Sequence, residues 1–270
     1  MRRRLTIAAV LTTTVAVTSV ATGHPAGLRQ SIEGAVASKS RTPANVARDK
    51  YRHPVDTLTF FGVKPGDTVV EFSPGSGWYT EILAPLVKDK GRYVALVGPR
   101  GADGATKMIE GKRALYGPGA SVATIDGATG TSTVAPGSAD VVLTFRNVHN
   151  MLMNDDPAVA GRMFAAFYAA LKPGGTLGVV DHRLPEEMDT AKEKTSGYIK
   201  RSTVVKLAEG AGFKLAGESQ VNANPRDDHD HPKGVWTLPP TYDLGDTDKA
   251  TYAAIGESDR MTLKFRKPAK

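Results

Sequence analysis

Short apolar runs alternate with longer segments of mixed polarity from about residue 68 to the C-terminus. The runs are nearly continuous, which is typical of strands buried on both faces of a parallel sheet. They predict strands over 68–72, 92–97, 121–125, 140–145, 176–181, 213–219 and 261–265, with helices between them. The pattern therefore predicts an α/β sheet that is covered by helices on both faces.

Turn-forming residues mark the ends of the expected helices. Thr42 and Pro43 are typical of a helix start, and Gly62 ends a second helix over about 55–61. Pro85 should shorten or kink the helix that follows the first strand. Further helices are expected over 105–115, 156–171 and 202–211.

The N-terminus has a different composition. Three arginines follow Met1, residues 5–20 are uncharged, and Ser19-Val20-Ala21 matches a small-x-small cleavage pattern. This predicts a signal peptide over 1–21, with a membrane anchor as the alternative and twin-arginine export as a possible route. The mature protein is then periplasmic or secreted, and it meets the membrane only through the uncleaved signal peptide. Residues 22–41 are small and polar and are expected to form a flexible arm before a domain over 42–270.

Composition excludes several classes of protein. The formal charge is +7, and removal of the three signal-peptide arginines lowers it to +4, without a basic run that would suit nucleic acid. There are no cysteines, so disulfides and thiolate metal sites are excluded. A mature chain of about 250 residues can bury one core without them.

The main chemical motif lies at the end of the first expected strand. The apolar run ends in Glu71, and a turn with Gly75 and Gly77 leads into a helix. Glycine lets a ligand approach the backbone, and a helix start offers unpaired N–H groups. A dinucleotide turn is disfavoured because the third glycine is absent, and Trp78 and Tyr79 stand where a pyrophosphate needs room.

This turn resembles the first motif of class I S-adenosylmethionine (SAM) methyltransferases, written E/D-x-G-x-G-x-G, with Ser73 in place of the first glycine. Stretches 63–71, 171–177 and 208–213 resemble turns of the same family at the expected places. The resemblance covers about 55–265. It implies a Rossmann-like seven-stranded sheet, mostly parallel, whose last strand inserts antiparallel beside the sixth. Stretches 71–85, 145–150 and 263–268 resemble a narrower group of predicted exported methyltransferases without assigned substrates.

One departure from the family pattern concerns the cofactor. Most members carry an acid at the end of strand two, which binds the ribose hydroxyls. Here the strand ends in Leu96-Val97-Gly98-Pro99-Arg100, without a carboxylate. Ribose recognition must then come from elsewhere, or the affinity for SAM is weak, or the ligand is not SAM.

The resemblance implies a SAM site at the carboxyl ends of the strands. Glu71 would hold the methionine or ribose part, and Asp126 would accept a hydrogen bond from the adenine amino group, although it also suits an ordinary turn. The residues expected to contact SAM are Glu71, Ser73, Pro74, Gly75, Gly77, Tyr79, Asp126, Arg146 and Asn147.

The methyl acceptor is expected at the same end of the sheet. His149 is the preferred general base, because the strand-four loop commonly lies beside the transferred methyl group in the resembling fold; a neutral imidazole suits that role. The charged segment 48–54 is expected to cover the site, unless it is only a solvated helix face. The residues expected to bind the acceptor are Tyr51, Arg52, His53, His182 and His229.

A long insertion over 221–259 should emerge on the same side. Its stretch 226–231, Arg-Asp-Asp-His-Asp-His, has side chains that suit a divalent metal, but it also suits a solvated loop, and no metal is assigned. Trp236 and Pro239-Pro240 would stiffen a lid.

The expected function is methyl transfer from SAM to an oxygen or nitrogen of a small molecule. The Asn-Pro-Pro-Tyr motif of adenine and glutamine methylation is absent after strand four, which argues against those acceptors. The alternative is a non-catalytic exported protein that binds SAM or a similar ligand. Export and the missing acid favour that alternative, and the glycine turn favours an enzyme. The sequence does not indicate the oligomeric state.

Overall fold

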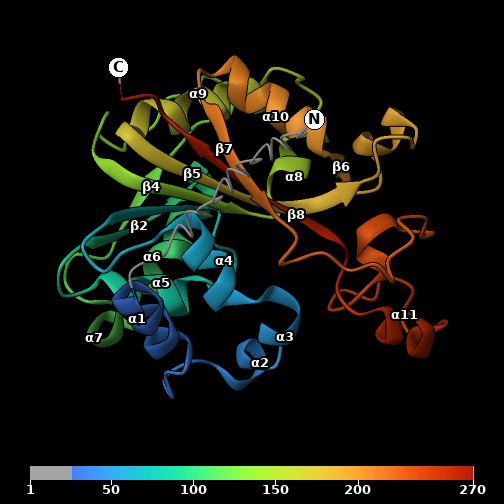
Figure 1. Cartoon of the computed structure of the whole chain (residues 1–270), viewed down its shortest axis with the longest axis horizontal. Coiled ribbons are helices and arrows are strands. Elements are labelled where there is room, and N and C mark those ends of the chain that lie inside the picture. Colours follow the sequence, from blue (N-terminus) through green and yellow to red (C-terminus); the bar gives the residue numbers. More distant parts are fainter. Residues whose placement is uncertain (1–25, 270) are drawn as a thin grey trace, which may run out of the picture.

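An eight-stranded sheet crosses the protein in the computed structural model, which describes residues 26–269 (Figure 1). The strand order is β3-β2-β1-β4-β5-β8-β7, and β6 pairs with β5 outside this path. The strands are β1 (Thr68–Phe72), β2 (Arg92–Val97), β3 (Ser121–Thr124), β4 (Ala139–Phe145), β5 (Leu171–Leu184), β6 (Ile199–Lys200), β7 (Lys214–Ser219) and β8 (Arg260–Arg266). The predicted signal peptide lies outside the described residues.

The directions of the strands confirm the expected fold class. β1 pairs in parallel with β2 and β4, β2 with β3, and β4 with β5. β8 lies between β5 and β7 and runs antiparallel to both. The expected seven strands are therefore present, and the eighth is the two-residue β6 beside the extended end of β5.

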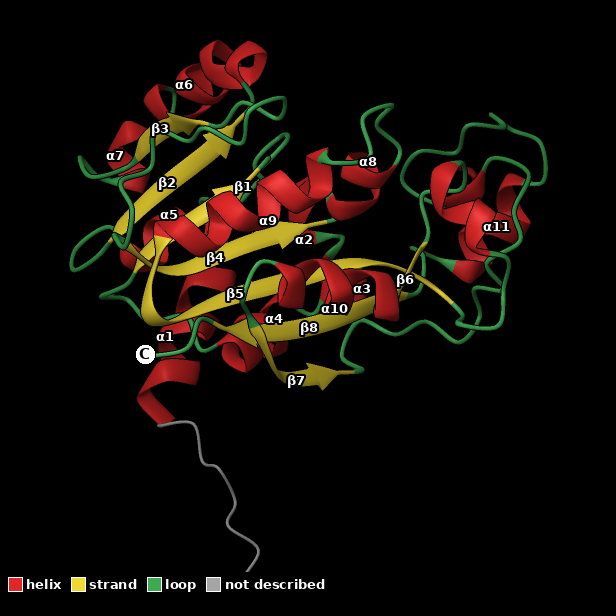
Figure 2. Ribbon diagram, turned by 90° about the horizontal axis from the view of Figure 1, so that it is seen from above, coloured by secondary structure: helices red, strands yellow, loops and turns green. Residues whose placement is uncertain are grey.

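Helices cover both faces of the sheet (Figures 1 and 2). One core cluster joins the sheet to α8, α9 and α10, and another joins it to α1, α4, α5, α6 and α7. The helices are α1 (Ala26–Val36), α2 (Pro43–Val46), α3 (Asp49–Arg52), α4 (Pro54–Phe61), α5 (Thr80–Val87), α6 (Ala102–Glu110), α7 (Arg113–Tyr116), α8 (Val148–Leu152), α9 (Val159–Ala170), α10 (Arg201–Gly210) and α11 (Lys249–Ile255), with short 3-10 turns η1 (Pro99–Gly101), η2 (Thr190–Lys194) and η3 (Gly234–Thr237).

Strand β1 shows why apolar runs become strands here. Successive side chains of a strand point to opposite faces, and the neighbours Val69 and Val70 belong to the two different core clusters. Both are fully buried, so each residue of the run removes apolar surface from water. Asp140 accepts a hydrogen bond from the backbone N–H of Thr68 at 2.8 Å, which aligns the starts of β1 and β4.

Two expectations about local structure were wrong. Part of the expected flexible arm, 22–41, is helix α1, whose Ile32 is fully buried against the core. The polar loop expected after strand four is helix α8, because Asp181 accepts a hydrogen bond from the N–H of Val148 and so satisfies a donor at the helix start.

The insertion over 221–259 contains η3 and α11 and lies beyond the carboxyl ends of the parallel strands (Figure 2). This is the side on which ligands bind in open α/β sheets. No helix within residues 26–269 combines the length and the apolar character needed to cross a bilayer.

Candidate active site

Three adjoining pockets lie at the carboxyl ends of the strands. We call them the β2–β3 pocket, about 600 Å³, the glycine-loop pocket, about 210 Å³, and the arginine pocket, about 320 Å³. Ser73 and Asn147 line both of the first two pockets, and Arg48, Arg52 and Arg146 line both of the last two. The three pockets therefore meet around the loop that follows β4.

The β2–β3 pocket combines an apolar surface with polar groups. Ile125, Met151 and Met163 supply apolar surface, while Asp126 and Asn147 supply oxygen and nitrogen atoms. One oxygen of Asp126 also accepts a hydrogen bond from the N–H of Ala128 at 2.8 Å, so the carboxylate is held in place. Such a pocket suits a flat heterocycle joined to a hydroxylated sugar.

The missing acid of β2 has a structural counterpart. Gly98, Pro99 and Arg100 line the β2–β3 pocket at the end of β2. Asn154, from the loop after α8, lines the same pocket; its amide oxygen accepts from the N–H of Asp156 at 3.0 Å and can accept one more hydrogen bond. Hydrogen bonds to a sugar can thus come from the α8 side of this pocket.

The glycine turn has a left-handed backbone at three positions. Ser73, Gly75 and Gly77 have φ values of 51°, 59° and 83°. Ser73 thus takes, at an energetic cost, the conformation that glycine takes easily at the corresponding position of the family motif. Ser73, Pro74 and Gly75 line the glycine-loop pocket, and Gly77 does not. A Cβ on Gly77 would lie 2.7 Å from the sulfur of Met108, so a side chain here would have to displace the flexible end of Met108.

Glu71 lines the glycine-loop pocket from a buried position. Its Oε2 accepts hydrogen bonds from the hydroxyls of Tyr93, at 2.6 Å, and Thr80, at 3.0 Å. Burial raises the pKa of Glu71 to about 7, against the opposite effect of these two hydroxyls. The hydrogen bonds of Glu71 come from neutral donors, and the charge of Arg146, which lines the same pocket, also acts to lower its pKa without forming an ion pair.

Tyr79 and Asn147 shape the floor of the same pocket. The ring of Tyr79 stacks on Phe145 with centroids 3.5 Å apart and planes at 11°. Asn147 donates from Nδ2 to the carbonyl oxygens of Phe72, at 3.1 Å, and Phe145, at 3.2 Å. Asn147 thereby ties together the ends of β1 and β4.

Four arginines gather around one carboxylate at the arginine pocket. Glu257, which is 5% exposed, accepts from Arg48 Nε at 2.7 Å and Arg52 Nε at 3.2 Å, and it pairs with Arg260 Nη1 at 3.0 Å. These guanidinium groups hold the pKa of Glu257 at about 2, although burial acts in the opposite direction. Arg146 is the fourth arginine, and Glu257 acts on it through space without an ion pair.

His149 faces the arginine pocket from α8. Its Nδ1 lies 2.8 Å from Oδ1 of Asp181, at the end of β5. Because a carboxylate only accepts, Nδ1 carries the hydrogen and Nε2 is the basic nitrogen of the neutral ring. Asp181 is fully buried, and it also accepts from the N–H groups of Val148 and His182.

His182 and Trp236 close the pocket around His149. The His182 ring lies 5.0 Å from that of His149 and the Trp236 ring 6.1 Å from it, measured between centroids. Burial lowers the pKa of His182 well below its usual range, and its Nδ1 lies 2.5 Å from the hydroxyl of Ser258. Trp236, Pro239 and Pro240 form the apolar wall of the pocket.

Three of the expected acceptor-binding residues do not line the arginine pocket. The carbonyl of Tyr51 accepts from buried Arg260, and its ring contacts Gly256. His53 occupies a left-handed link between α3 and α4. Arg52 and His182 do line the pocket, and their roles remain predictions.

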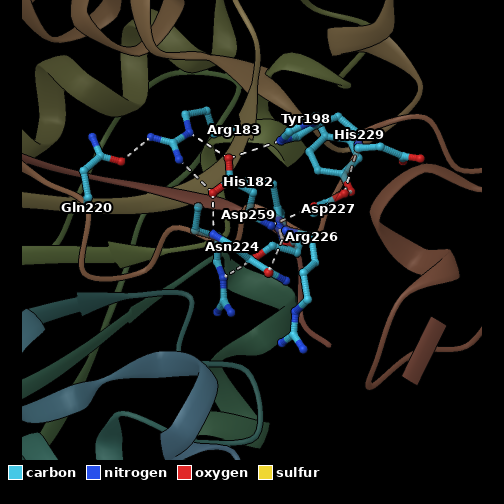
Figure 3. A network of polar contacts seen from close by, with 12 residues as sticks. His182, Arg183, Tyr198, Gln220, Asn224, Arg226, Asp227, His229 and Asp259 are labelled. Atoms are coloured by element: carbon cyan, nitrogen blue, oxygen red, sulfur yellow. Dashed lines mark hydrogen bonds and ion pairs between the residues drawn. The ribbon is translucent and has the colours of Figure 1, made fainter. Parts of the chain in front are cut away.

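The third, His229, belongs to a separate polar network beneath the insertion (Figure 3). Its Nε2 lies 3.1 Å from Asp259, which also forms a two-pronged pair with Arg183 at 2.8 Å for both contacts. Asp227 accepts from the hydroxyl of Tyr198 at 2.9 and 3.0 Å and from the backbone N–H of Asp259 at 2.7 Å. This network anchors the insertion to β5, through Arg183, and to Tyr198 just before β6.

Two groups of side chains in the described part of the chain have the spacing of metal ligands. One joins His149, Asp181 and His182, and the other joins Asp227, Asp228 and His231. The sequence pattern pointed to the second group, in which Asp227 already bonds His231 at 2.8 Å. In both groups the buried aspartate is already hydrogen-bonded by protein donors.

Sequence reasoning missed Glu257 and Arg260 as part of the site, and it included Arg48 only within the segment 48–54 that was expected to cover the site. Glu257 lies near the end of the insertion and Arg260 is the first residue of β8, and the sequence motifs assigned no role to either. The one available signal was the density of charge in the segment 48–54, which holds two of the residues now placed beside the pockets.

Comparison with known proteins identifies the fold but no close relative. No family model matches the chain, and no curated protein matches it in sequence. A SAM-dependent methyltransferase from Aquifex aeolicus aligns with a TM-score of 0.56 at 16% identity, over 88% of this chain and 98% of that chain. A SAM-dependent methyltransferase from Methanosarcina mazei aligns with a TM-score of 0.51 at 12% identity, over 79% of this chain and 97% of that chain.

The [4+2]-cyclase SpnF has the same architecture, with a TM-score of 0.57 at 14% identity over 89% of this chain and 93% of that chain. Identities this low show the fold alone, and a cyclase among the similar structures means that chemistry must be argued from the site. The strand order, with an antiparallel β8 between β5 and β7, is the order that the resemblance to class I methyltransferases led us to expect. The chain has the class I SAM-dependent methyltransferase fold.

Proposed function

We propose that this protein transfers a methyl group from SAM to an oxygen or nitrogen of a small molecule, with His149 as the general base. One observation carries the proposal. The Nδ1 of His149 is fixed by Asp181 at 2.8 Å, and its ring faces a pocket that adjoins the glycine turn. A positioned base next to a cofactor turn is the arrangement that methyl transfer to a protonated nucleophile requires.

The described residues fit SAM in size and chemistry. The β2–β3 pocket would take the adenosine part, with Asp126 and Asn154 as hydrogen-bonding groups. The open backbone at Gly75 would lie against the methionine part, since nothing lies within 4 Å of a Cβ built there. When bound, SAM supplies an electrophilic methyl group on a sulfonium.

His149 would take the proton that the nucleophile loses. Nε2 has no hydrogen-bond partner within the residues that the structure describes, while Nδ1–H donates to Asp181. The buried carboxylate of Asp181 would stabilise the resulting imidazolium and fix its orientation. Trp236 and the two prolines beside it would exclude water from the pocket.

The first test is isothermal titration of the mature chain with SAM and S-adenosylhomocysteine, with NAD as the control. We expect micromolar binding of the first two, about −8 kcal/mol. Methyl transfer from labelled SAM to a panel of small hydroxy and amino compounds then tests catalysis. His149→Gln should lower kcat by about 10²- to 10⁴-fold. His53→Gln, at a histidine outside the pockets, is the matched control.

The second candidate function is non-catalytic binding of a ligand, and the absence of an acid at the end of β2 favours it. Gly98, Pro99 and Arg100 line the pocket there without an acid, which favours a non-catalytic protein that binds SAM or a similar ligand. SAM binding with no methyl transfer to any compound, and no difference between His149→Gln and the parent, would select this alternative.

We also propose that the protein is exported, on the basis of residues 1–21 alone. The N-terminal residue of protein from the periplasm or medium checks this, because cleavage after Ala21 would leave Thr22 first. Accumulation of the uncleaved chain in the cytoplasm would contradict it.

A further inference from the structure

The arginine pocket has more positive charge than its protein partners neutralise. Arg48, Arg52 and Arg146 line it, and Glu257 is the one carboxylate among its lining residues. Arg260 adds a fourth guanidinium group behind Glu257. Buried charges normally have partners, because an unpaired ion in a protein interior costs several kcal/mol.

Within the residues that the structure describes, one of these arginines has a buried donor without a partner, and another, which is partly exposed, forms no ion pair. Arg52 is 2% exposed, and its Nη1 is buried without a hydrogen-bond partner within residues 26–269. Arg146 forms no ion pair with a described residue, and its backbone is left-handed with φ of 61°. A strained backbone that directs an unpaired guanidinium into a pocket is typical of a binding site.

Neighbouring groups do not supply all of the missing negative charge. Glu71 lines the glycine-loop pocket with the same arginines and interacts with Arg146 through space, but burial raises its pKa to about 7, so near neutral pH it offsets less than one positive charge. The charge of Asp181 is matched by its bonds to His149 and two backbone N–H groups. Asp259 is paired with Arg183 and His229. The arginines therefore repel one another. Burial is the largest cause of the lowered pKa of Arg52, and Arg146, Arg48 and Arg260 each lower it further.

SAM would not balance this charge either. It carries a carboxylate, an ammonium and a sulfonium, so its net charge is +1. Even if its carboxylate met one of these arginines from the glycine-loop pocket, two positive charges would arrive with it. The counter-charge must therefore come from the other ligand in the arginine pocket.

We propose that the methyl acceptor carries an oxyanion, a carboxylate or a phosphate, which binds to Arg52 and Arg146 in the arginine pocket. The assignment of this anion to the methyl acceptor rests on the proposed function, but the existence of the anion site does not. Guanidinium groups bind both oxyanions through paired N–H donors. Near Trp236 and His149, the rest of the molecule would have a flat or apolar part and a nucleophile that loses a proton.

Simple anions test the site. The mature chain is titrated with acetate, inorganic phosphate and neutral acetamide at constant ionic strength, and binding is followed by NMR and thermal stability, with and without saturating S-adenosylhomocysteine. We expect saturable millimolar binding of acetate or phosphate but not of acetamide, in both conditions. Whichever anion binds more tightly indicates a carboxylate or a phosphate on the acceptor.

Variants locate the site. Arg52→Met and Arg146→Met should each weaken anion binding about tenfold or more, because each removes charge-assisted hydrogen bonds. Arg226→Met, at an exposed arginine of the insertion that lines none of the three pockets, should leave it unchanged. Two variants are used so that poor folding of one does not decide the result.

Three outcomes would overturn the inference: equal binding of acetamide and acetate, unchanged anion binding in both pocket variants, or loss of anion binding when S-adenosylhomocysteine is bound. The last would assign the arginines to the cofactor carboxylate. Failure of S-adenosylhomocysteine to bind at all would instead count against the proposed function. The anion titration without it would still show whether the site exists.

Discussion

Two buried polar clusters lie under the same insertion, and they differ in how fully they are satisfied. In the first, Asp227 and Asp259 accept from Tyr198, Arg183, histidines and backbone N–H groups, so each carboxylate is surrounded by donors (Figure 3). In the second, the arginines of the arginine pocket share Glu257, and Arg52 keeps a buried donor without a partner among the described residues.

The difference separates a structural role from a binding role. A saturated network gains little from a ligand, because every donor and acceptor already has a partner. An unsaturated buried cluster is destabilising until a ligand of the opposite charge arrives. The composition of the loop 226–231 suited either a metal site or a solvated loop, whereas the hydrogen bonds favour the second cluster as the ligand site.

The largest expected effect comes from Glu257→Gln. It removes the carboxylate that pairs with three arginines, and we expect a loss of about 3–5 kcal/mol in the free energy of unfolding. Denaturant unfolding measures this, and phosphate should recover part of the loss by binding the folded state. Asp227→Asn is the matched change in the saturated network. It should also destabilise, but phosphate should not rescue it, and equal rescue of both variants would break the comparison.

Glu71 extends the comparison to a buried carboxylate whose hydrogen-bond donors are neutral hydroxyls and which forms no ion pair with a described residue. Burial raises its folded pKa from 4.5 to about 7, so the folded protein holds this proton more tightly than the unfolded chain. Its contribution to stability therefore falls as pH rises from about 4.5 to about 7, by up to about 3 kcal/mol, and stays low above pH 7. Glu71→Gln should remove this dependence and be more stable than the parent at pH 8. An identical pH profile for the two proteins in denaturant unfolding would contradict this.

The same variant tests the placement of the cofactor. If Glu71 binds SAM, Glu71→Gln and Glu71→Ala should weaken SAM binding in the titration. Unchanged SAM affinity in Glu71→Ala would mean that the methionine or ribose part lies elsewhere.

Arg146→Gly should stabilise the protein by about 1 kcal/mol while it weakens anion binding. Glycine relieves the strain of the left-handed backbone at φ of 61° and removes an unpaired cation. Together these two gains in folding free energy exceed the cost of the entropy that glycine adds to the unfolded chain. Arg183→Met should instead destabilise the protein, since it breaks the two-pronged pair with Asp259 in the saturated network. Thermal unfolding of the two variants compares the signs, and the same sign for both would contradict the distinction.

The smallest effect is expected for Ser73→Gly in the glycine turn. Ser73→Gly should change stability by no more than about 0.5 kcal/mol, because relief of the strain at φ of 51° offsets the added flexibility of the unfolded chain. SAM affinity should persist, since the backbone keeps its path. Ser73→Val should cost about 1–2 kcal/mol, because a β-branched residue is poorly tolerated at positive φ. Equal stability of the two variants in thermal unfolding would rule out strain at this position.

The sequence was sufficient for most of the architecture. The predicted limits 68–72 and 92–97 agree with β1 and β2, because buried strands are continuous apolar runs that end at turn residues. It was not sufficient for α1 and α8, which are held by tertiary contacts: Ile32 is buried on the core, and Asp181 binds the start of α8 from another strand. Short helices depend on such contacts more than on propensity.

The sequence by itself determined the sheet, the glycine turn and the presence of His149 and Arg146 after β4, since each depends on neighbours along the chain. Only the tertiary structure decided that Asp181 holds His149, that Asp227 is saturated, and that Arg52 meets Glu257 across 205 positions of sequence. Hydrophobic periodicity is a local property, but the neutralisation of a buried charge depends on which distant residues the fold brings within a few ångströms.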